Sequence, residues 1–169
     1  MWCKDGKKFT DNEIRQAHPN TSFPIPMELH HIQDFGYSEF VRTPQPLVGP
    51  YEYAEEDLLV TKEGGLIQSW VVKQHGPEKI EQILVSAVQN LLDFEAQKYG
   101  YDDIKSVVTY AEEPEVEKFQ LEGLAFRKWR SQVWAACYAI MGDVLAGKRA
   151  VPTVEELVKE LPILTVTNK

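Results

Sequence analysis

Residues 123–147, GLAFRKWRSQVWAACYAIMGDVLAG, restrict the possible folds of this chain more than any other stretch. Apolar residues recur there at steps of three and four, which places them along one side of a helix. This side comprises Phe126, Trp129, Val133, Ala136, Cys137, Ile140, Met141 and Val144. Trp134 and Tyr138 lie one turn apart and widen the apolar face. Gly147 is expected to end the helix as a C-cap. So much aromatic surface must be covered by other helices of the chain or by a partner.

Composition excludes several classes of partner and compartment. The net charge is −8, from 26 acidic and 18 basic residues, which argues against nucleic acid because phosphate binding needs a basic surface. No apolar run approaches the ~20 residues that span a bilayer, and the first residues carry no signal-peptide core. Cys3 and Cys137 are far apart and indicate no disulfide framework. We therefore expect a protein made in a cytoplasm, with no membrane partner.

Turn signals dominate the first fifty residues. Thr10 and Glu13 form a capping box, which predicts a short helix over residues 11–18. A second helical turn is expected over residues 27–33, with Gly36 ending it. A loop is predicted at Pro44, Pro46 and Pro50, because proline cannot donate a hydrogen bond within a sheet.

Strands are predicted over residues 37–42 and then in a small antiparallel meander. The meander has strands at residues 58–62 and 66–73, joined by a Glu-Gly-Gly turn at residues 63–65, where glycine supplies positive φ. Two or three strands alone are only marginally stable in water. We therefore expect this part to pack on a neighbouring copy or on a larger assembly.

The second half of the chain is helical in character. A regular apolar stripe covers residues 77–98, and a short helix is expected over residues 102–110. An acidic, proline-marked start at residues 112–114 precedes the long helix. Pro152 and a capping box at Thr153 begin a last helix, over residues 153–161. Four such helices can form a bundle.

The predicted fold class is therefore α+β. Residues 1–75 form a turn-rich N-terminal part with short helices and the small β-meander. Residues 76–169 form the helical bundle. The other helices of this bundle are expected to cover the inner face of the long helix as core, through Trp129, Val133, Cys137, Ile140 and Val144.

No residue pattern indicates catalysis, a cofactor or a metal. His30 and His31 are adjacent with Asp34 near them, but sequence neighbours on a helix point in different directions and no further ligand follows at metal-binding spacing. Cys137 lies on an apolar helix face, where a thiol is unreactive. Acidic runs occur at turns and helix starts, where solvation and the helix dipole explain them. Phosphate-binding glycine loops and nucleophile-elbow motifs are absent from the sequence.

The aromatic long helix has two interpretations. In the first, Trp129, Trp134 and Tyr138 are bundle core, as such stripes usually are. In the second, part of this face, with Arg127 and Arg130 at its edge, meets another subunit. Trp, Tyr and Arg are the residue types enriched at interface hot spots. The candidate partner interface comprises Arg127, Arg130, Trp134 and Tyr138.

Two parts of the chain resemble proteins of tailed bacteriophages. Residues 9–24, FTDNEIRQAHPNTSFP, and 65–72, GLIQSWVV, resemble the N-terminal part of small proteins encoded in tail-fibre regions, those of cyanophages included. The helical half is similar to a C-terminal domain of phage and prophage tail proteins. The segments that carry this similarity are residues 88–93, 100–104, 122–138 and 146–162, which include the motifs GYDDI, EGLAFRKWRSQVWAACY and AGKRAVPTVEELVKELP.

The resemblance implies a tail-fibre, baseplate or tail-associated structural protein of the virion, assembled with other tail proteins and itself oligomeric. Fibres are usually trimeric, so a trimer is expected by analogy. The alternative is a tail-fibre assembly chaperone that is not retained in the virion. A third hypothesis, a small hydrolase that uses His30 and His31, has the least support. The resemblance brings no catalytic residues and no cofactor.

Overall fold

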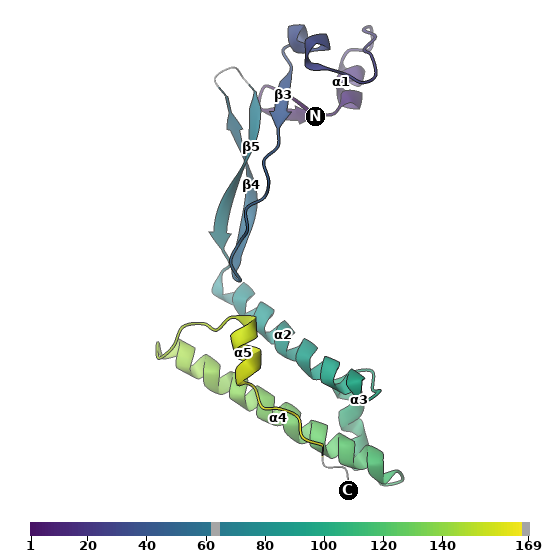
Figure 1. The fold of residues 1–169 in the computed structure, drawn as a ribbon, viewed down its shortest axis with the longest axis vertical. Coiled ribbons are helices and arrows are strands. Elements are labelled where there is room, and N and C mark those ends of the chain that lie inside the picture. Colours follow the sequence, from purple (N-terminus) through teal and green to yellow (C-terminus); the bar gives the residue numbers. More distant parts are fainter. Residues whose placement is uncertain (62–64, 167–169) are drawn as a thin grey trace. The chain divides into compact units, whose positions relative to one another are not determined.

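The computed structural model describes residues 1–61 and 65–166 of the chain. Contacts between Cα atoms divide it into two compact units, Met1–His75 and Gly76–Lys169 (Figure 1). Strands are found in the first unit and long helices in the second, so the fold class is α+β as predicted. The turn predicted at residues 63–65 lies largely outside the described residues.

A five-stranded mixed sheet forms the frame of the first unit, with strand order β2-β1-β3-β5-β4. Its strands are β1 Trp2–Lys4, β2 Lys7–Phe9, β3 Ser38–Val41, β4 Glu52–Val60 and β5 Leu66–Gln74. The predicted antiparallel pair is present as β4 and β5, but the sheet is larger than a meander. Strand β3 runs parallel to β5 and antiparallel to β1, so it joins two hairpins into one sheet.

The strand boundaries differ from the predicted ones at two places. Strand β4 begins at Glu52, six residues before the predicted start at residue 58, because its acidic residues are tolerated on a solvent-exposed edge strand. The hairpin of β1 and β2 was not predicted. It turns at Asp5 and Gly6, with φ of 49° and 73°, which is the pattern of a type I′ turn.

A buried thiol lies where three strands meet. Cys3 of β1 is completely buried beside Phe40 of β3 and Leu66 of β5. The Leu66 N–H donates to the Cys3 Sγ atom at 3.1 Å, and this thiol lies 3.3 Å from the carbonyl oxygen of Glu39. The side chain therefore supplies polar contacts between strands that are separated by more than thirty residues in sequence.

A second small core lies beside the sheet. Helix α1, Asp11–Ala17, begins at the predicted capping box of Thr10 and Glu13. Two 3₁₀ turns, η1 Leu29–His31 and η2 Gln33–Phe35, follow in place of one helical turn over residues 27–33. The core cluster comprises Trp2, Ile14, Phe23, Met27, Ile32 and Tyr37.

The second unit contains helices α2 Pro77–Lys98, α3 Ile104–Thr109, α4 Glu117–Leu145 and α5 Val154–Glu160, with a 3₁₀ turn η3 at Tyr110–Glu112. Helix α4 begins at Glu117, after the predicted acidic start, because Glu112 belongs to η3. Side chains from all four helices share one core, which comprises Val88, Leu92, Ala96, Ile104, Val107, Phe126, Trp129, Val133, Leu157 and Leu161.

A close backbone approach fixes α4 against η3. A Cβ atom on Gly123 would lie 2.4 Å from the backbone nitrogen of Ala111, so no larger residue fits without movement of the backbone. Beside this contact, the Tyr101 hydroxyl donates to Oε2 of the buried Glu122 at 2.6 Å. Burial, and then this hydrogen bond, raise the pKa of Tyr101 well above its usual range. One end of α4 is thus held by packing and by a buried polar pair.

Candidate assembly surfaces

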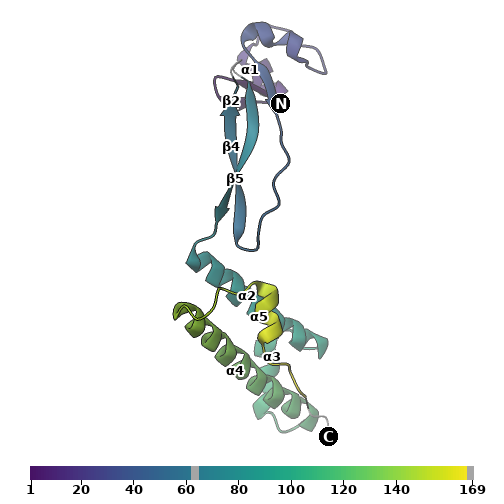
Figure 2. The same ribbon diagram turned by 60° about the vertical axis from the view of Figure 1, so that its left-hand side comes forward.

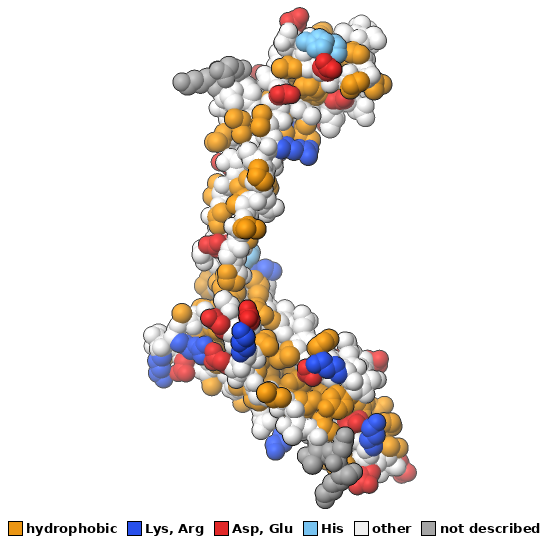
Figure 3. Space-filling view, in the orientation of Figure 1, with side chains coloured by type: hydrophobic (Ala, Val, Ile, Leu, Met, Phe, Trp, Pro, Cys, Tyr) orange, Lys and Arg blue, Asp and Glu red, His pale blue; other side chains and the backbone are white. Residues whose placement is uncertain are grey.

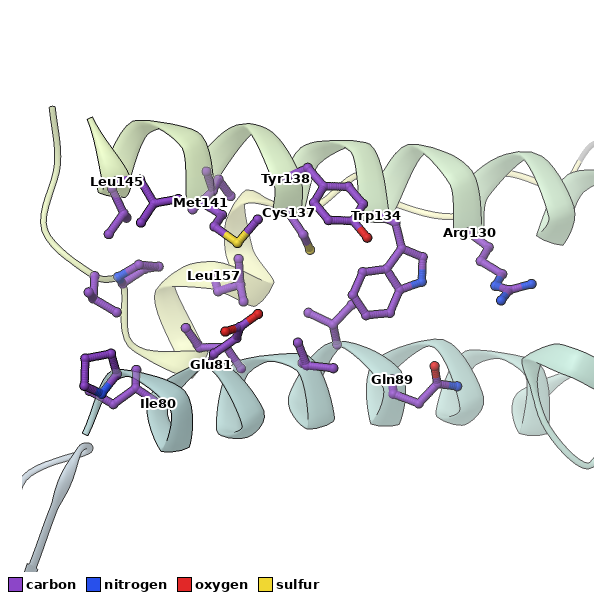
Figure 4. Close-up of a pocket in the computed structure, with 18 residues that line it drawn as sticks. Ile80, Glu81, Gln89, Arg130, Trp134, Cys137, Tyr138, Met141, Leu145 and Leu157 are labelled. Atoms are coloured by element: carbon purple, nitrogen blue, oxygen red, sulfur yellow. The ribbon is translucent and has the colours of Figure 1, made fainter. Parts of the chain in front are cut away.

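The other end of α4 is covered only in part. There the helix faces α2 across a groove of ≈ 790 Å³, with α5 and the segment before it as the floor (Figure 4). Side chains from α2 that line the groove include Ile80, Leu84 and Val85, and Val151 and Leu157 line it from the α5 region. The α4 wall comprises Arg130, Trp134, Cys137, Tyr138, Ile140, Met141, Val144 and Leu145.

Helix α4 carries two adjacent apolar stripes: the first is buried, and the second is exposed except at Trp134, which is partly buried against the core. Phe126, Trp129 and Val133 of the first stripe are buried in the core. The second stripe runs from Trp134 through Tyr138 and Met141 to Leu145, at steps of four, three and four. Tyr138 is 66% exposed and Leu145 is 80% exposed. Large apolar side chains gathered at the surface mark interaction sites.

Three of the four residues proposed from sequence as a partner interface lie around this groove. Arg130, Trp134 and Tyr138 line it. Arg127 does not: its Nη1 atom donates to Oε1 of Glu112 at 2.8 Å, near η3. Met141 and Leu145 were not predicted for this surface, although both continue the spacing that starts at Trp134 and Tyr138.

The expected core face of α4 is covered only in part. Cys137 and Ile140 are partly buried and pack against the core cluster, while Val144 lines the open groove and is outside that cluster. The prediction that core extends as far as Val144 was therefore wrong. Helices α2 and α5 are the elements placed to cover this half of α4, but the pocket leaves space between them and it.

Charges at the groove fall into two groups. Beside the lining residues, Lys148 pairs with Asp143 and Arg149 pairs with Glu160. Arg130 on α4 and Glu81 on α2 line the groove itself. Within the described residues, neither has an ion-pair or hydrogen-bond partner.

The β4–β5 hairpin is a second uncovered surface, in the first unit. Nine residue pairs join the two strands, yet only Leu66 among their side chains is buried. Exposed hydrophobic side chains of the hairpin are Tyr53, Leu59, Val60, Val71 and Val72, and because neighbouring strand residues point to opposite faces, both faces carry some of them. Apolar side chains are visible along the face of the hairpin that Figure 3 shows. Strand β4 is also the edge of the sheet.

Part of the hairpin has support from the segment that follows β3, which runs beside it (Figure 2). The Thr43 hydroxyl donates to the carbonyl oxygen of Gln68 at 2.7 Å, and the Trp70 indole donates to the carbonyl oxygen of Thr43 at 3.2 Å. These bonds hold the side of β5 that faces β3. They leave the outer edge of β4 and its apolar side chains open to a partner.

The histidine pair and the thiol considered from sequence show no reactive arrangement. His30 and His31 are at η1, and the His31 Nδ1 atom accepts from the backbone N–H of Glu28 at 3.0 Å. Burial raises the pKa of the Cys137 thiol, which disfavours the thiolate. Across residues 1–61 and 65–166, no three His, Cys, Asp or Glu side chains are grouped to hold a metal ion. In the same residues, no helix has the length and apolar character needed to cross a membrane.

No family model, no curated protein and no solved structure matches the chain.

Proposed function

We propose that the chain is a structural component of a bacteriophage tail fibre or of its baseplate attachment region, and that it acts by protein–protein assembly. The phage setting comes from the resemblance of its sequence motifs. The assembly role is supported by the surfaces that the fold leaves uncovered. Other tail proteins are the proposed partners, together with further copies of the chain, and the tail of the virion is the proposed location.

The exposed apolar surface of the β4–β5 hairpin is the main observation that supports the assembly role. Strands of nine residues with a single buried side chain gain little from hydrophobic burial within this unit. A protein–protein contact over Leu59 and Val71 would remove exposed apolar surface and complete the edge of the sheet at β4. Exposed strand edges with apolar side chains otherwise promote aggregation.

Mass spectrometry of purified virions tests the proposal. The chain should be present in intact particles at a constant ratio to a known tail protein. Its absence from particles that are complete and infective would refute the structural role.

A matched pair of variants tests the hairpin itself, supplied in trans to a phage that lacks the gene. The change Leu59→Gln with Val71→Thr should reduce incorporation into particles, because both side chains face a partner in the proposal. The control is Ile163→Thr, a comparable change at a more exposed side chain of the other unit. Equal incorporation of both variants would remove the hairpin from the assembly role.

A tail-fibre assembly chaperone is the second candidate, and the open groove favours it. A space of ≈ 790 Å³ lined by apolar side chains can hold a segment of a client protein for a time and then release it. Co-expression with the fibre gene separates the two candidates. A chaperone should increase the yield of soluble fibre and be missing from the particle, whereas a structural component should be retained.

A further inference from the structure

We propose that a second copy of this chain closes the groove between α2 and α4, so that two grooves pack on each other across a two-fold axis. Helix α4 of one copy would lie antiparallel to α4 of the other. This inference goes beyond the proposed function, because the dimer can exist whether or not the chain is retained in a phage particle.

The spacing on α4 fits a helix partner. Trp134, Tyr138, Met141 and Leu145 follow the four-three-four steps by which helices pack along a common seam. From Trp134 to Leu145 the stripe covers twelve residues, whose eleven steps of about 1.5 Å make about 17 Å of helix. A facing helix of three turns is therefore long enough to cover it.

Two unpaired charges make the groove complementary to itself. Arg130 lies at one end on α4, and Glu81 lies nearer the other end on α2 (Figure 4). A two-fold axis across the groove exchanges its ends, so Arg130 of each copy is brought toward Glu81 of the other. The ion pair between Arg130 of one copy and Glu81 of the other then forms twice in one dimer.

This arrangement favours a second copy over an unrelated helix. In a two-fold interface the same patch must carry both members of every contact pair. The groove meets this condition with one unpaired cation and one unpaired anion, while Asp143 and Glu160 nearby are already paired within the chain. A groove shaped for a foreign helix needs no such balance.

The first test measures self-association of the full chain by sedimentation velocity over a range of concentrations. Wild type should form dimers. Leu145→Gln removes an apolar anchor that is 80% exposed in a single copy, so it should leave the fold intact. Because the change occurs twice per dimer, the dissociation constant should rise by about a hundredfold. The control is Leu124→Gln, which alters an exposed side chain of α4 outside the groove and should leave dimerisation unchanged.

The second test uses the charges. Arg130→Glu and Glu81→Arg should each raise the dissociation constant by at least about tenfold, because each homodimer then contains two like-charge contacts. Mixing the two variants should produce a heterodimer with nearly wild-type affinity, because both contacts again join opposite charges. Circular dichroism of each variant checks that its helices are retained.

Several results would overturn the proposal. A wild-type chain that stays monomeric at about 100 µM would exclude the dimer. A trimer or a dimer that Leu145→Gln leaves intact would place self-association on another surface, such as the hairpin. Failure of the mixed charge variants to associate better than either alone would exclude the two-fold arrangement. Binding of a fibre-derived helical peptide to a monomeric chain would assign the groove to a client instead.

Discussion

The close approach of α4 to η3 at Gly123 gives a sharp test of how the helical unit packs. In the variant Gly123→Ala, the new Cβ atom would lie 2.4 Å from the backbone nitrogen of Ala111 and 2.6 Å from the carbonyl carbon of Tyr110. Ordinary contact begins at 3.4 Å, so α4 and η3 must separate by about 1 Å. Neither neighbour is the end of a flexible side chain, so the backbone itself has to move.

Two opposing effects set the size of the change. Replacing glycine by alanine inside a helix normally stabilises it by about 0.5–1 kcal/mol. Overpacking costs about 1–3 kcal/mol, and a clash between backbone segments belongs at the upper end of that range. We expect a net loss of about 2 kcal/mol in the free energy of unfolding. For a unit of this size that loss lowers the melting temperature by about 8–16 °C.

Thermal and urea unfolding of the full chain, followed by circular dichroism at the helix band, measure this effect. Gly142→Ala is the matched control, because it lies on the same helix with no atom within 4 Å of its new Cβ position. The control should gain about 0.5–1 kcal/mol from helix propensity alone. If Gly123→Ala were as stable as Gly142→Ala, the close approach of α4 to η3 would be refuted.

Three other variants test the polar contacts of the same unit. Tyr101→Phe should cost about 1–3 kcal/mol in urea unfolding, because the buried Glu122 carboxylate loses its hydroxyl donor. Trp129→Phe should cost about 2 kcal/mol and speed carboxypeptidase digestion, since the indole N–H donates to a carbonyl of the C-terminal segment at 2.7 Å. The backbone N–H and hydroxyl of Thr153 hold the pKa of Glu156 below its ordinary value of 4.5. The carboxylate therefore stabilises the folded unit above pH 4.5. This stabilisation is lost as the pH falls through the lower folded pKa, so the free energies of unfolding of wild type and Glu156→Gln should become equal at that pH.

Local signals predicted most of the helices and their ends. Gly147 has positive φ and follows α4, as predicted, and Gly100 follows α2 in the same left-handed conformation. The capping boxes at Thr10 and Thr153 begin α1 and α5 where they were predicted. These features depend on residues within a few positions of each other, so a single sequence reveals them.

Features that depend on distant residues were harder to predict. Nothing near Phe40 indicates that β3 pairs in parallel with β5. The Asp5-Gly6 turn was a readable hairpin signal, but three-residue strands carry too little periodicity to draw attention to it. Similarly, the spacing of Tyr138 and Leu145 identifies an apolar stripe. It does not show whether the chain itself covers that stripe, because coverage depends on where α2 and α5 lie.

The two cysteines offer a consequence for following how this chain unfolds. Cys3 is fully enclosed where three strands of the first unit meet, and Cys137 is partly buried in the second unit. Each unit therefore contains one natural thiol. Labelling with a thiol reagent in rising denaturant, followed by peptide mass analysis, reports the opening of each unit separately, without an added probe. The rate at Cys3 measures separation of the strands, and the rate at Cys137 measures exposure of the groove wall, so closure of the groove by any partner would slow only the second reaction.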